Sequence, residues 1–133
     1  MSWDVSIINF SRDYNSIEEI PDDEKPLELG SRAEIHEAVS EFFPGTDWSE
    51  ASWGRFNCQF GSIEFNLGEN DPSDSLMLHV RASDDVVPLI VAMCKKKNWS
   101  GLDCSNGDFL EKSKNPSSGI DGWKNLLQQV TSK

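Results

Sequence analysis

Glu64 and His79 are the two residues whose types could do acid/base chemistry if the fold brings them together. A carboxylate can hold one histidine tautomer and tune the histidine pKa close to neutral pH. Asn66 and Arg81 follow at a spacing of two, so they share the strand faces of Glu64 and His79. One hypothesis is therefore a small enzyme or ligand-binding domain that uses these four residues. The stronger interpretation is a solvated or partner-binding face, because any exposed sheet face collects such residues.

Other catalytic and metal-binding motifs are missing from the sequence. It contains no G-x-S-x-G, no phosphate-cradling glycine loop and no dinucleotide fingerprint. Two histidines and three scattered cysteines give no zinc spacing, and segment 69–75 lacks the glycine and the terminal glutamate of an EF-hand loop. We therefore predict a protein that is not an enzyme and that binds neither a metal nor a cofactor.

Three consecutive strands are predicted to position the Glu64 and His79 side chains. Apolar residues alternate in three neighbouring segments, which indicates an antiparallel meander. We place a hairpin turn at Gly61-Ser62 and a longer turn at 68–75. The alternating residues are Phe56, Cys58 and Phe60, then Ile63, Phe65 and Leu67, then Leu76, Leu78 and Val80.

The register between the last two strands follows from keeping their apolar side chains on one face. If Leu67 lies opposite Leu76, Glu64 lies opposite His79. The other face of these strands then presents Glu64, Asn66, Met77, His79 and Arg81.

A strand and a helix precede this meander. Ser31 and Glu34 have the spacing of a capping box, so a helix begins there, and Pro44-Gly45 ends it. Segment 46–54 is then expected to be a loop. The strand before the helix is indicated by alternation at Trp3, Val5 and Ile7.

Two further helices and a hairpin are predicted after the meander. Segment 83–97 is acidic at its start and basic at its end, and its middle is apolar all round, which predicts a central, buried helix. Segment 102–111 contains Asn-Gly and predicts a short hairpin. Ser118 and Asp121 have a second capping-box spacing. The final helix would bury a stripe of Ile120, Trp123, Leu127 and Val130.

Together these elements predict a single α+β domain over residues 1–133, with an antiparallel sheet and two or three helices packed on one face. The longest apolar run, 86–94, is too short to span a membrane. Cys58, Cys94 and Cys104 have apolar neighbours and favour reduced core thiols, so we expect a cytoplasmic protein.

Charge placement is the strongest indication of function. Residues 1–50 hold 13 acidic and three basic side chains, a net charge of −10 out of −11 for the whole chain. This field repels nucleic acid and anionic membranes, and it attracts a basic protein surface. We divide it into segment 18–28, expected to be an acidic surface loop without fixed geometry, and a helical stripe of Glu34, Glu37 and Glu41.

Trp48 and Trp53 lie in the polar segment next to this acidic helix. Aromatic anchors surrounded by carboxylates suit the binding of a cationic protein, since tryptophan supplies buried area and cation–π contact. The alternative is that both indoles pack over the open end of the sheet. Because Trp53 directly precedes a strand, Trp48 is the one expected to be exposed.

The chain resembles immunity proteins, which bacteria keep against their own toxins, in its size, acidity and arrangement of helices on a small sheet. The segments 47–54 and 62–81 are also similar to a run in small uncharacterised bacterial proteins. The first resemblance implies a non-enzymatic inhibitor that covers a basic toxin domain, with Glu34, Glu37, Glu41, Trp48 and Trp53 as the binding residues. A third hypothesis is a nucleic-acid mimic, which needs carboxylates in ordered rows.

Overall fold

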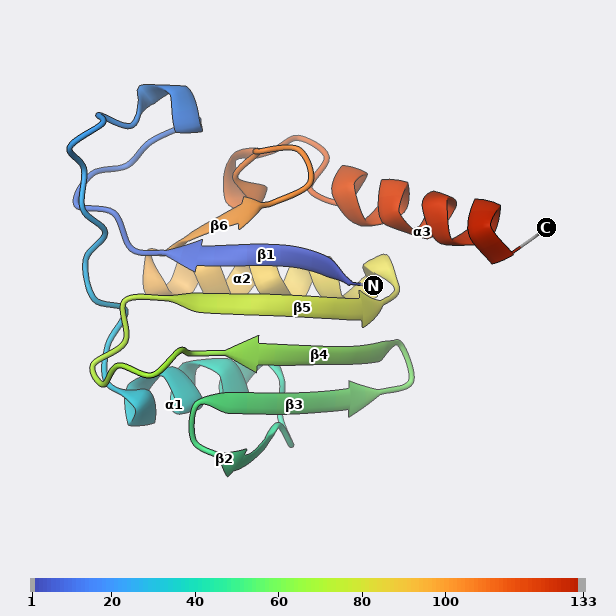
Figure 1. Cartoon of the computed structure of the whole chain (residues 1–133), viewed down its shortest axis with the longest axis horizontal. Helices are drawn as coiled ribbons and strands as arrows, with labels where there is room; N and C mark the ends of the chain where they lie inside the picture. The colour runs from blue at the N-terminus through green and yellow to red at the C-terminus, as the bar shows by residue number, and fades with distance from the viewer. Residues whose placement is uncertain (1, 132–133) are drawn as a thin grey trace.

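The computed structural model describes residues 2–131, without the side chains of residues 127 and 129–131. It is a single α+β domain built on one six-stranded antiparallel sheet, in the order β2-β3-β4-β5-β1-β6 (Figure 1). The strands are β1 (Trp3–Ile8), β2 (Asp47–Glu50), β3 (Trp53–Cys58), β4 (Gly61–Asn66), β5 (Leu76–Ala82) and β6 (Ser100–Asp103). The helices are α1 (Arg32–Phe42), α2 (Val87–Lys97) and α3 (Ser118–Thr131), with short 3-10 turns η1 (Ile17–Glu19), η2 (Asp84–Val86) and η3 (Leu110–Lys112).

The predicted meander and its register are confirmed, because β4 pairs with β5 so that Glu64 lies opposite His79. The hairpin turn differs from the prediction. Cys58 pairs with Gly61, so the two turn residues are Gln59 and Phe60 and not Gly61-Ser62. A side chain at residue 61 would meet the Arg81 carbonyl oxygen at 2.3 Å, so this glycine permits close approach to β5.

The predicted loop at 46–54 is wrong, because it contains the edge strand β2 and the start of β3. Gly54 on β3 leaves room for a side chain of the neighbouring strand β2. A Cβ atom at this position would lie 2.6 Å from the Trp48 ring, so the glycine makes room for that indole. A four-residue strand with mostly exposed side chains gives too short a pattern for sequence reading.

The core lies between one face of the sheet and helices α1 and α2, which run behind it in Figure 1. The capping box at Ser31 and Glu34 is confirmed. The prediction that 83–97 forms a wholly buried helix is wrong: α2 buries one side and leaves Pro88, Leu89 and Ala92 exposed. In this two-layer fold the sheet and α1 cover only part of the helix.

The hairpin predicted at 102–111 is reduced to a single bridge between Leu102 and Phe109. Residues 100–103 form β6 and pair with β1 at the sheet edge, which satisfies their backbone groups instead. Ser118 is the first residue of α3 and not its cap. In the predicted stripe of this helix, Ile120 is buried and Trp123 half-buried, while the side chains of 127 and 130 lie outside the described residues.

The three cysteines are free, but only Cys94 is a core thiol as predicted. Cys58 ends β3 and Cys104 follows β6, and both are exposed. The apolar residues beside them in the sequence do not surround them in the fold, since alternate strand residues face opposite sides.

Candidate protein-binding surfaces

The glutamate stripe on α1 is largely engaged inside the chain. Glu34 accepts the Ser31 backbone N–H at 3.1 Å, and its hydrogen bonds with Ser31 hold the pKa of the carboxyl below its usual value. Glu41 forms an ion pair with Lys96 at the end of the neighbouring helix α2. Of the three glutamates, only Glu37 forms no hydrogen bond or ion pair with another described residue. The sequence could not place the lysines of α2 beside this stripe.

Trp48, which the sequence suggested as the exposed anchor, packs inward. Its ring stacks on His36 with centroids 3.9 Å apart, and its indole N–H lies 3.2 Å from the Ser40 hydroxyl. It also contacts Phe65 of the core at a centroid distance of 6.3 Å. This indole therefore fixes β2 to α1 and does not protrude from the surface.

Trp53 lies on the open face of the sheet, next to Glu64 and Arg81. Its indole N–H donates to Glu64 Oε2 at 2.7 Å, while Arg81 donates to Glu64 Oε1 at 2.8 Å. The hydrogen bond from Trp53, followed by the bond and charge of Arg81, holds the pKa of Glu64 below its usual value. Glu64 is thus an ionised carboxylate with both oxygens occupied, which is a poor general base.

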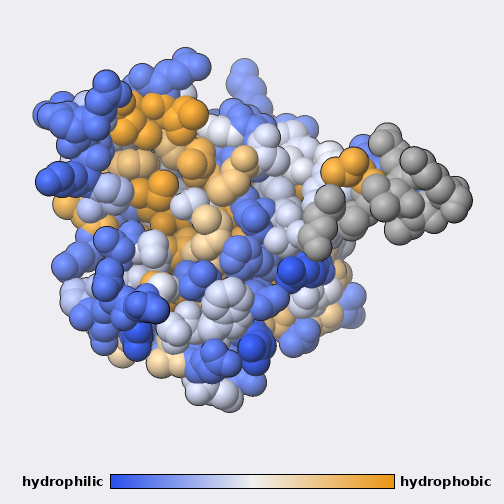
Figure 2. Space-filling model, viewed as in Figure 1, coloured by the Kyte–Doolittle hydropathy of each residue, from blue (hydrophilic) through white to orange (hydrophobic). Residues whose placement is uncertain are grey.

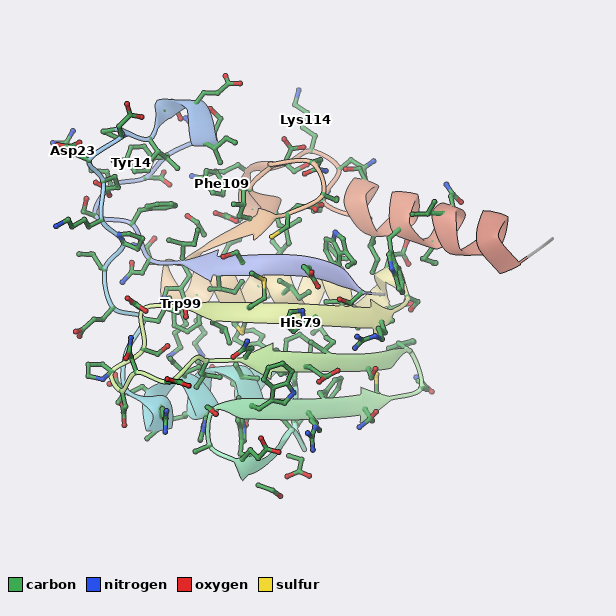
Figure 3. All side chains as sticks on the ribbon, viewed as in Figure 1. Tyr14, Asp23, His79, Trp99, Phe109 and Lys114 are labelled. Carbon is green, nitrogen blue, oxygen red and sulfur yellow. The ribbon has the colours of Figure 1, made fainter. Side chains whose placement is uncertain are left out.

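His79 occupies the middle of the open face (Figure 3), but its hydrogen-bond partner is Asp4 and not Glu64. Its Nδ1 lies 2.9 Å from Asp4 Oδ1, and its ring stacks on Trp53. Burial raises the pKa of Asp4, but hydrogen bonds from Ser2 and His79 outweigh this effect and the pKa is lowered. The sequence missed Asp4 because it lies 75 residues away on β1.

A cavity of about 530 Å³ lies beside Asp4, between β1 and the start of α3. Its other walls include Cys104, Trp123 and Leu126, so it is mainly apolar. Across the part of the chain that the structure describes, no group of three His, Cys, Asp or Glu side chains could hold a metal ion. None of the helices described is both long and apolar enough to cross a membrane.

The strongest concentration of exposed carboxylates lies elsewhere, on two loops along the left edge in Figure 1. We call this region the acidic end. It contains the exposed carboxylates Glu18, Glu19, Asp22, Asp23 and Glu28 on the loop after β1, and Glu69, Asp71 and Asp74 on the loop between β4 and β5. Asp13 on the first loop is exposed as well, but it is paired with Lys112. The sequence indicates only the first of these loops as an acidic surface.

Backbone and side-chain contacts hold the acidic end in place. The Leu27 N–H donates to the Asn9 carbonyl oxygen at 2.7 Å, and Leu29 and Gly30 form backbone bonds with Ser73 at 2.8 Å. Ser73 is fully buried, and its Oγ lies 2.7 Å from the carbonyl oxygens of Leu67 and Ser75. Segment 18–28 is irregular and mostly exposed in the structure, and the backbone bond of Leu27 joins its end to the chain beside β1.

An aromatic cluster provides a second attachment for this loop. Phe10 contacts both Tyr14 and Phe109 edge to face, with ring centroids 5.4 Å and 6.0 Å apart. Tyr14 is only 7% exposed although it belongs to an otherwise exposed segment. In Figure 3, Tyr14 and Asp23 lie together at the edge of the molecule, well apart from His79.

Apolar side chains are exposed within the acidic end. Ile17 and Leu27 are each 46% exposed, and both have glutamates as direct neighbours in the sequence. Figure 2 shows hydrophobic residues gathered on this part of the surface and bordered by hydrophilic ones. The sequence carried this signal, because two large apolar residues in an acidic, proline-containing loop have no helix or strand period to explain them.

Comparison of the chain with protein-family models, with curated proteins and with solved structures finds no match. The functional assignment therefore depends on the surfaces themselves.

Proposed function

We propose that this protein is a non-enzymatic inhibitor that binds a basic protein, in the manner of an immunity protein and its toxin domain. The observation that carries the proposal is that Ile17 and Leu27 are both exposed on the carboxylate-rich loop after β1. Protein interfaces combine an apolar centre with a polar rim, and the acidic end has this composition. The partner surface that fits it has an apolar centre and lysine or arginine side chains around it.

The acidic end takes the role that the sequence gave to α1, because its carboxylates are available to a partner. Six of these carboxylates form no side-chain hydrogen bond or ion pair with another described residue: Glu18, Asp22, Asp23, Glu28, Glu69 and Asp74. An unpaired exposed carboxylate steers a cationic partner and can pair with it without first losing an internal contact. The irregular loops give no rows of evenly spaced carboxylates, so nucleic-acid mimicry is less well supported.

If the adjacent gene encodes a toxin domain, co-expression with that domain tests the proposal. We expect a stable complex in which the toxin activity is lost, and an association rate that falls steeply as salt is added. An adjacent gene without such a domain, or a toxin domain that is neither bound nor inhibited, would overturn the proposal.

Replacement of the apolar centre localises the binding surface. Ile17→Ser combined with Leu27→Ser should weaken the complex by roughly tenfold or more, because buried apolar anchors dominate binding energy. Leu89→Ser is the matched control, since Leu89 is 36% exposed on α2. Equal weakening by the control would contradict the assignment of the acidic end.

The second candidate, a ligand-binding domain on the open sheet face, has one observation in its favour. Asp4 holds His79 and also lines the cavity beside α3. His79→Gln distinguishes the two functions. Inhibition of the toxin domain should persist in this variant if the acidic end binds it, and should disappear if the open face does.

A further inference from the structure

The cavity beside α3 has a volume of about 530 Å³, which is within the range of sites that bind small organic ligands. It lies between the first residues of β1, the chain that follows β6, and α3. In Figure 1 the start of β1 and α3 lie at the right, opposite the acidic end at the left. A ligand in this cavity would therefore be bound apart from the surface that we assign to the basic partner.

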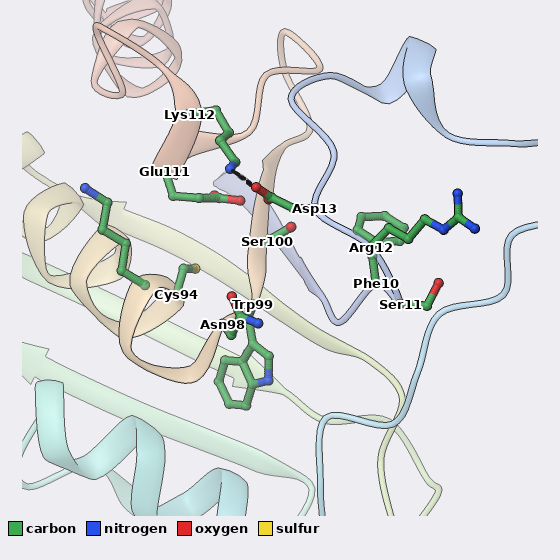
Figure 4. A pocket seen from close by; sticks show the side chains of 11 residues that line it. Phe10, Ser11, Arg12, Asp13, Cys94, Asn98, Trp99, Ser100, Glu111 and Lys112 are labelled. Atoms are coloured by element: carbon green, nitrogen blue, oxygen red, sulfur yellow. Dashed lines mark hydrogen bonds and ion pairs between the residues drawn. The ribbon is translucent and has the colours of Figure 1, made fainter.

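Asp4 supplies the only charged side chain among the described residues that line this cavity. A second cleft, of about 350 Å³ at the end of α2, differs in this respect (Figure 4). Basic and acidic side chains both line that cleft, and Lys112 there is paired with Asp13, with Nζ 2.7 Å from Oδ1. The cavity beside α3 thus favours one sign of charge, whereas the cleft favours neither.

The Asp4 carboxylate is accessible to a ligand, because its side chain is 40% exposed. Its Oδ1 atom lies 2.5 Å from the Ser2 hydroxyl oxygen and 2.9 Å from His79 Nδ1. Its Oδ2 atom forms no hydrogen bond with another described residue. The bonds from Ser2 and His79 favour the ionised carboxylate, so Asp4 can offer Oδ2 to a cationic donor.

The groups around Asp4 leave its negative charge available. Arg81 is the nearby cation, and it forms an ion pair with Glu64 at 2.8 Å. His79 can donate from Nδ1 to Asp4 as a neutral imidazole. Burial raises the pKa of the Cys104 thiol, and the negative charge of Asp4 raises it further, so Cys104 is an uncharged part of the wall at neutral pH.

Apolar side chains form much of the remaining wall. Trp3 is only 2% exposed, whereas Trp123 is half-buried and Leu126 is 46% exposed. Trp123 and Leu126 are therefore the side chains that a ligand can cover over a larger area. A tryptophan ring also attracts a cation placed over its face. These walls suit a cation that carries an apolar, aromatic body, and they do not suit a bare hydrated ion.

Gly119 and Gly122 line the cavity from α3. A Cβ atom at Gly119 would lie 1.9 Å from Asp103 Oδ2, so packing explains that glycine. A Cβ atom at Gly122 would meet no neighbouring heavy atom within 4 Å, so packing does not require a glycine there. Glycine is less favourable than alanine in a helix. The effect of Gly122 is to leave the cavity open beside Trp123.

We propose that this cavity binds a small primary amine with an aromatic body, with the ammonium group donating to Asp4 Oδ2 and the ring against Trp123 and Leu126. A primary ammonium fits better than a quaternary one, because only the primary group has N–H donors for the carboxylate oxygen. The inference does not rest on the proposed function, since no residue of the acidic end lines the cavity.

Titration of the full chain with 2-phenylethylamine, followed by proton–nitrogen NMR, tests this site. We expect saturable shifts of the Cys104 amide and of the Trp123 indole N–H. 2-Phenylethanol has nearly the same shape without the charge and should bind about tenfold more weakly, because a charge-assisted hydrogen bond is lost. Methylammonium keeps the charge without the aromatic body and should also bind about tenfold more weakly or worse. A control that binds as tightly as the amine, or an amine that shows no saturable binding, would overturn the proposal.

Two variants each alter one part of the site. Asp4→Asn keeps an oxygen that can accept from Ser2 and His79, and it should weaken the binding of 2-phenylethylamine about tenfold while leaving that of 2-phenylethanol unchanged. Gly122→Leu places a side chain in the open space of the cavity and should abolish the binding of both compounds. Asn125→Leu is the matched control, because residue 125 is exposed on the same helix and does not line the cavity.

Unchanged binding of the amine in Asp4→Asn or in Gly122→Leu would overturn the proposal, as would an equal loss in the Asn125→Leu control. If Asp4→Asn does not fold, the comparison of the amine with the alcohol on the unmodified chain decides. N-acetyl-lysine N-methylamide carries the same ammonium group on a peptide-like body. Tighter binding of this compound than of 2-phenylethylamine would identify a protein side chain as the occupant and would also overturn the proposal.

Discussion

Helix α1 and the acidic end both carry several carboxylates, and they differ in what those carboxylates do within the chain. On α1, Glu34 caps its own helix and Glu41 pairs with Lys96. At the acidic end, Asp22 and Asp23 lie on a loop that backbone bonds join to the rest of the fold, and neither side chain forms a hydrogen bond or ion pair with another described residue. Two of the three glutamates on α1 thus form contacts that stabilise the fold, while most carboxylates of the acidic end remain available to a partner.

The largest expected effect comes from loosening the acidic end at Ser73. Ser73→Ala removes the hydroxyl that lies between two carbonyl oxygens in a fully buried position. Leaving a buried carbonyl without its donor should lower the free energy of unfolding by about 1–3 kcal/mol. Urea denaturation measures this change, with the exposed Ser49→Ala as a control. A change no larger than the control would show that Ser73 does not anchor the loops.

Removal of the α1 cap should have the next largest effect. Ser31→Ala removes the hydroxyl that accepts the Glu34 backbone N–H at 3.1 Å. The loss of an N-cap typically costs about 1 kcal/mol, which thermal unfolding would detect. The association rate with a basic partner should stay the same, because the acidic end does not depend on this cap. A slower association would mean that α1 takes part in binding.

The ion pair between Glu41 and Lys96 should contribute less. Both side chains are about half exposed, at 42% and 54%, so solvent screens their attraction. A double-mutant cycle with Glu41→Gln and Lys96→Met should give a coupling of roughly 0.2–1 kcal/mol that decreases with salt. A coupling of zero would show that Glu41 is as available to a partner as the carboxylates of the acidic end, and it would weaken the contrast between the two regions.

The smallest expected effect is a dependence of stability on pH through Glu34. Because hydrogen bonds with Ser31 lower the pKa of Glu34 in the folded state, its ionised form adds stability above the unfolded pKa. That contribution is lost as the pH falls through the folded pKa. The difference in unfolding free energy between the unmodified chain and Glu34→Gln should therefore be constant at neutral pH and shrink below about pH 5. Glu37→Gln corrects for the loss of one charge, and a difference that does not change on acidification would rule out this role.

The sequence predicted the elements that have long, regular periods. The meander, the pairing of Glu64 with His79 and the cap at Ser31 all depend on contacts close in sequence or on a two-residue period. It failed where a distant strand supplied the partner: β6 pairs with β1, and Asp4 on β1 binds His79. Local patterns carry no information on such contacts.

The candidate site was only partly predictable for the same reason. The excess of acid in the first 50 residues was visible, but the loop at 69–74 joins it through contacts of the fold, namely the backbone bonds of Ser73 and the hydrogen bonds of Arg32 to Asp71 and to the Glu69 carbonyl. The lysine beside Glu41 comes from another helix, 55 residues away. Charge can be counted from a sequence, whereas its availability depends on which side chains the fold places next to it.

The association rate of two charge-reversed variants with the toxin domain tests the central claim most directly. Asp22→Lys with Asp23→Lys alters the acidic end, and Glu37→Lys with Glu41→Lys alters α1, and each pair reverses two negative charges. Stopped-flow measurements at low salt should show a much slower association for the first pair than for the second. Equal slowing, or a larger effect of the α1 pair, would contradict the account.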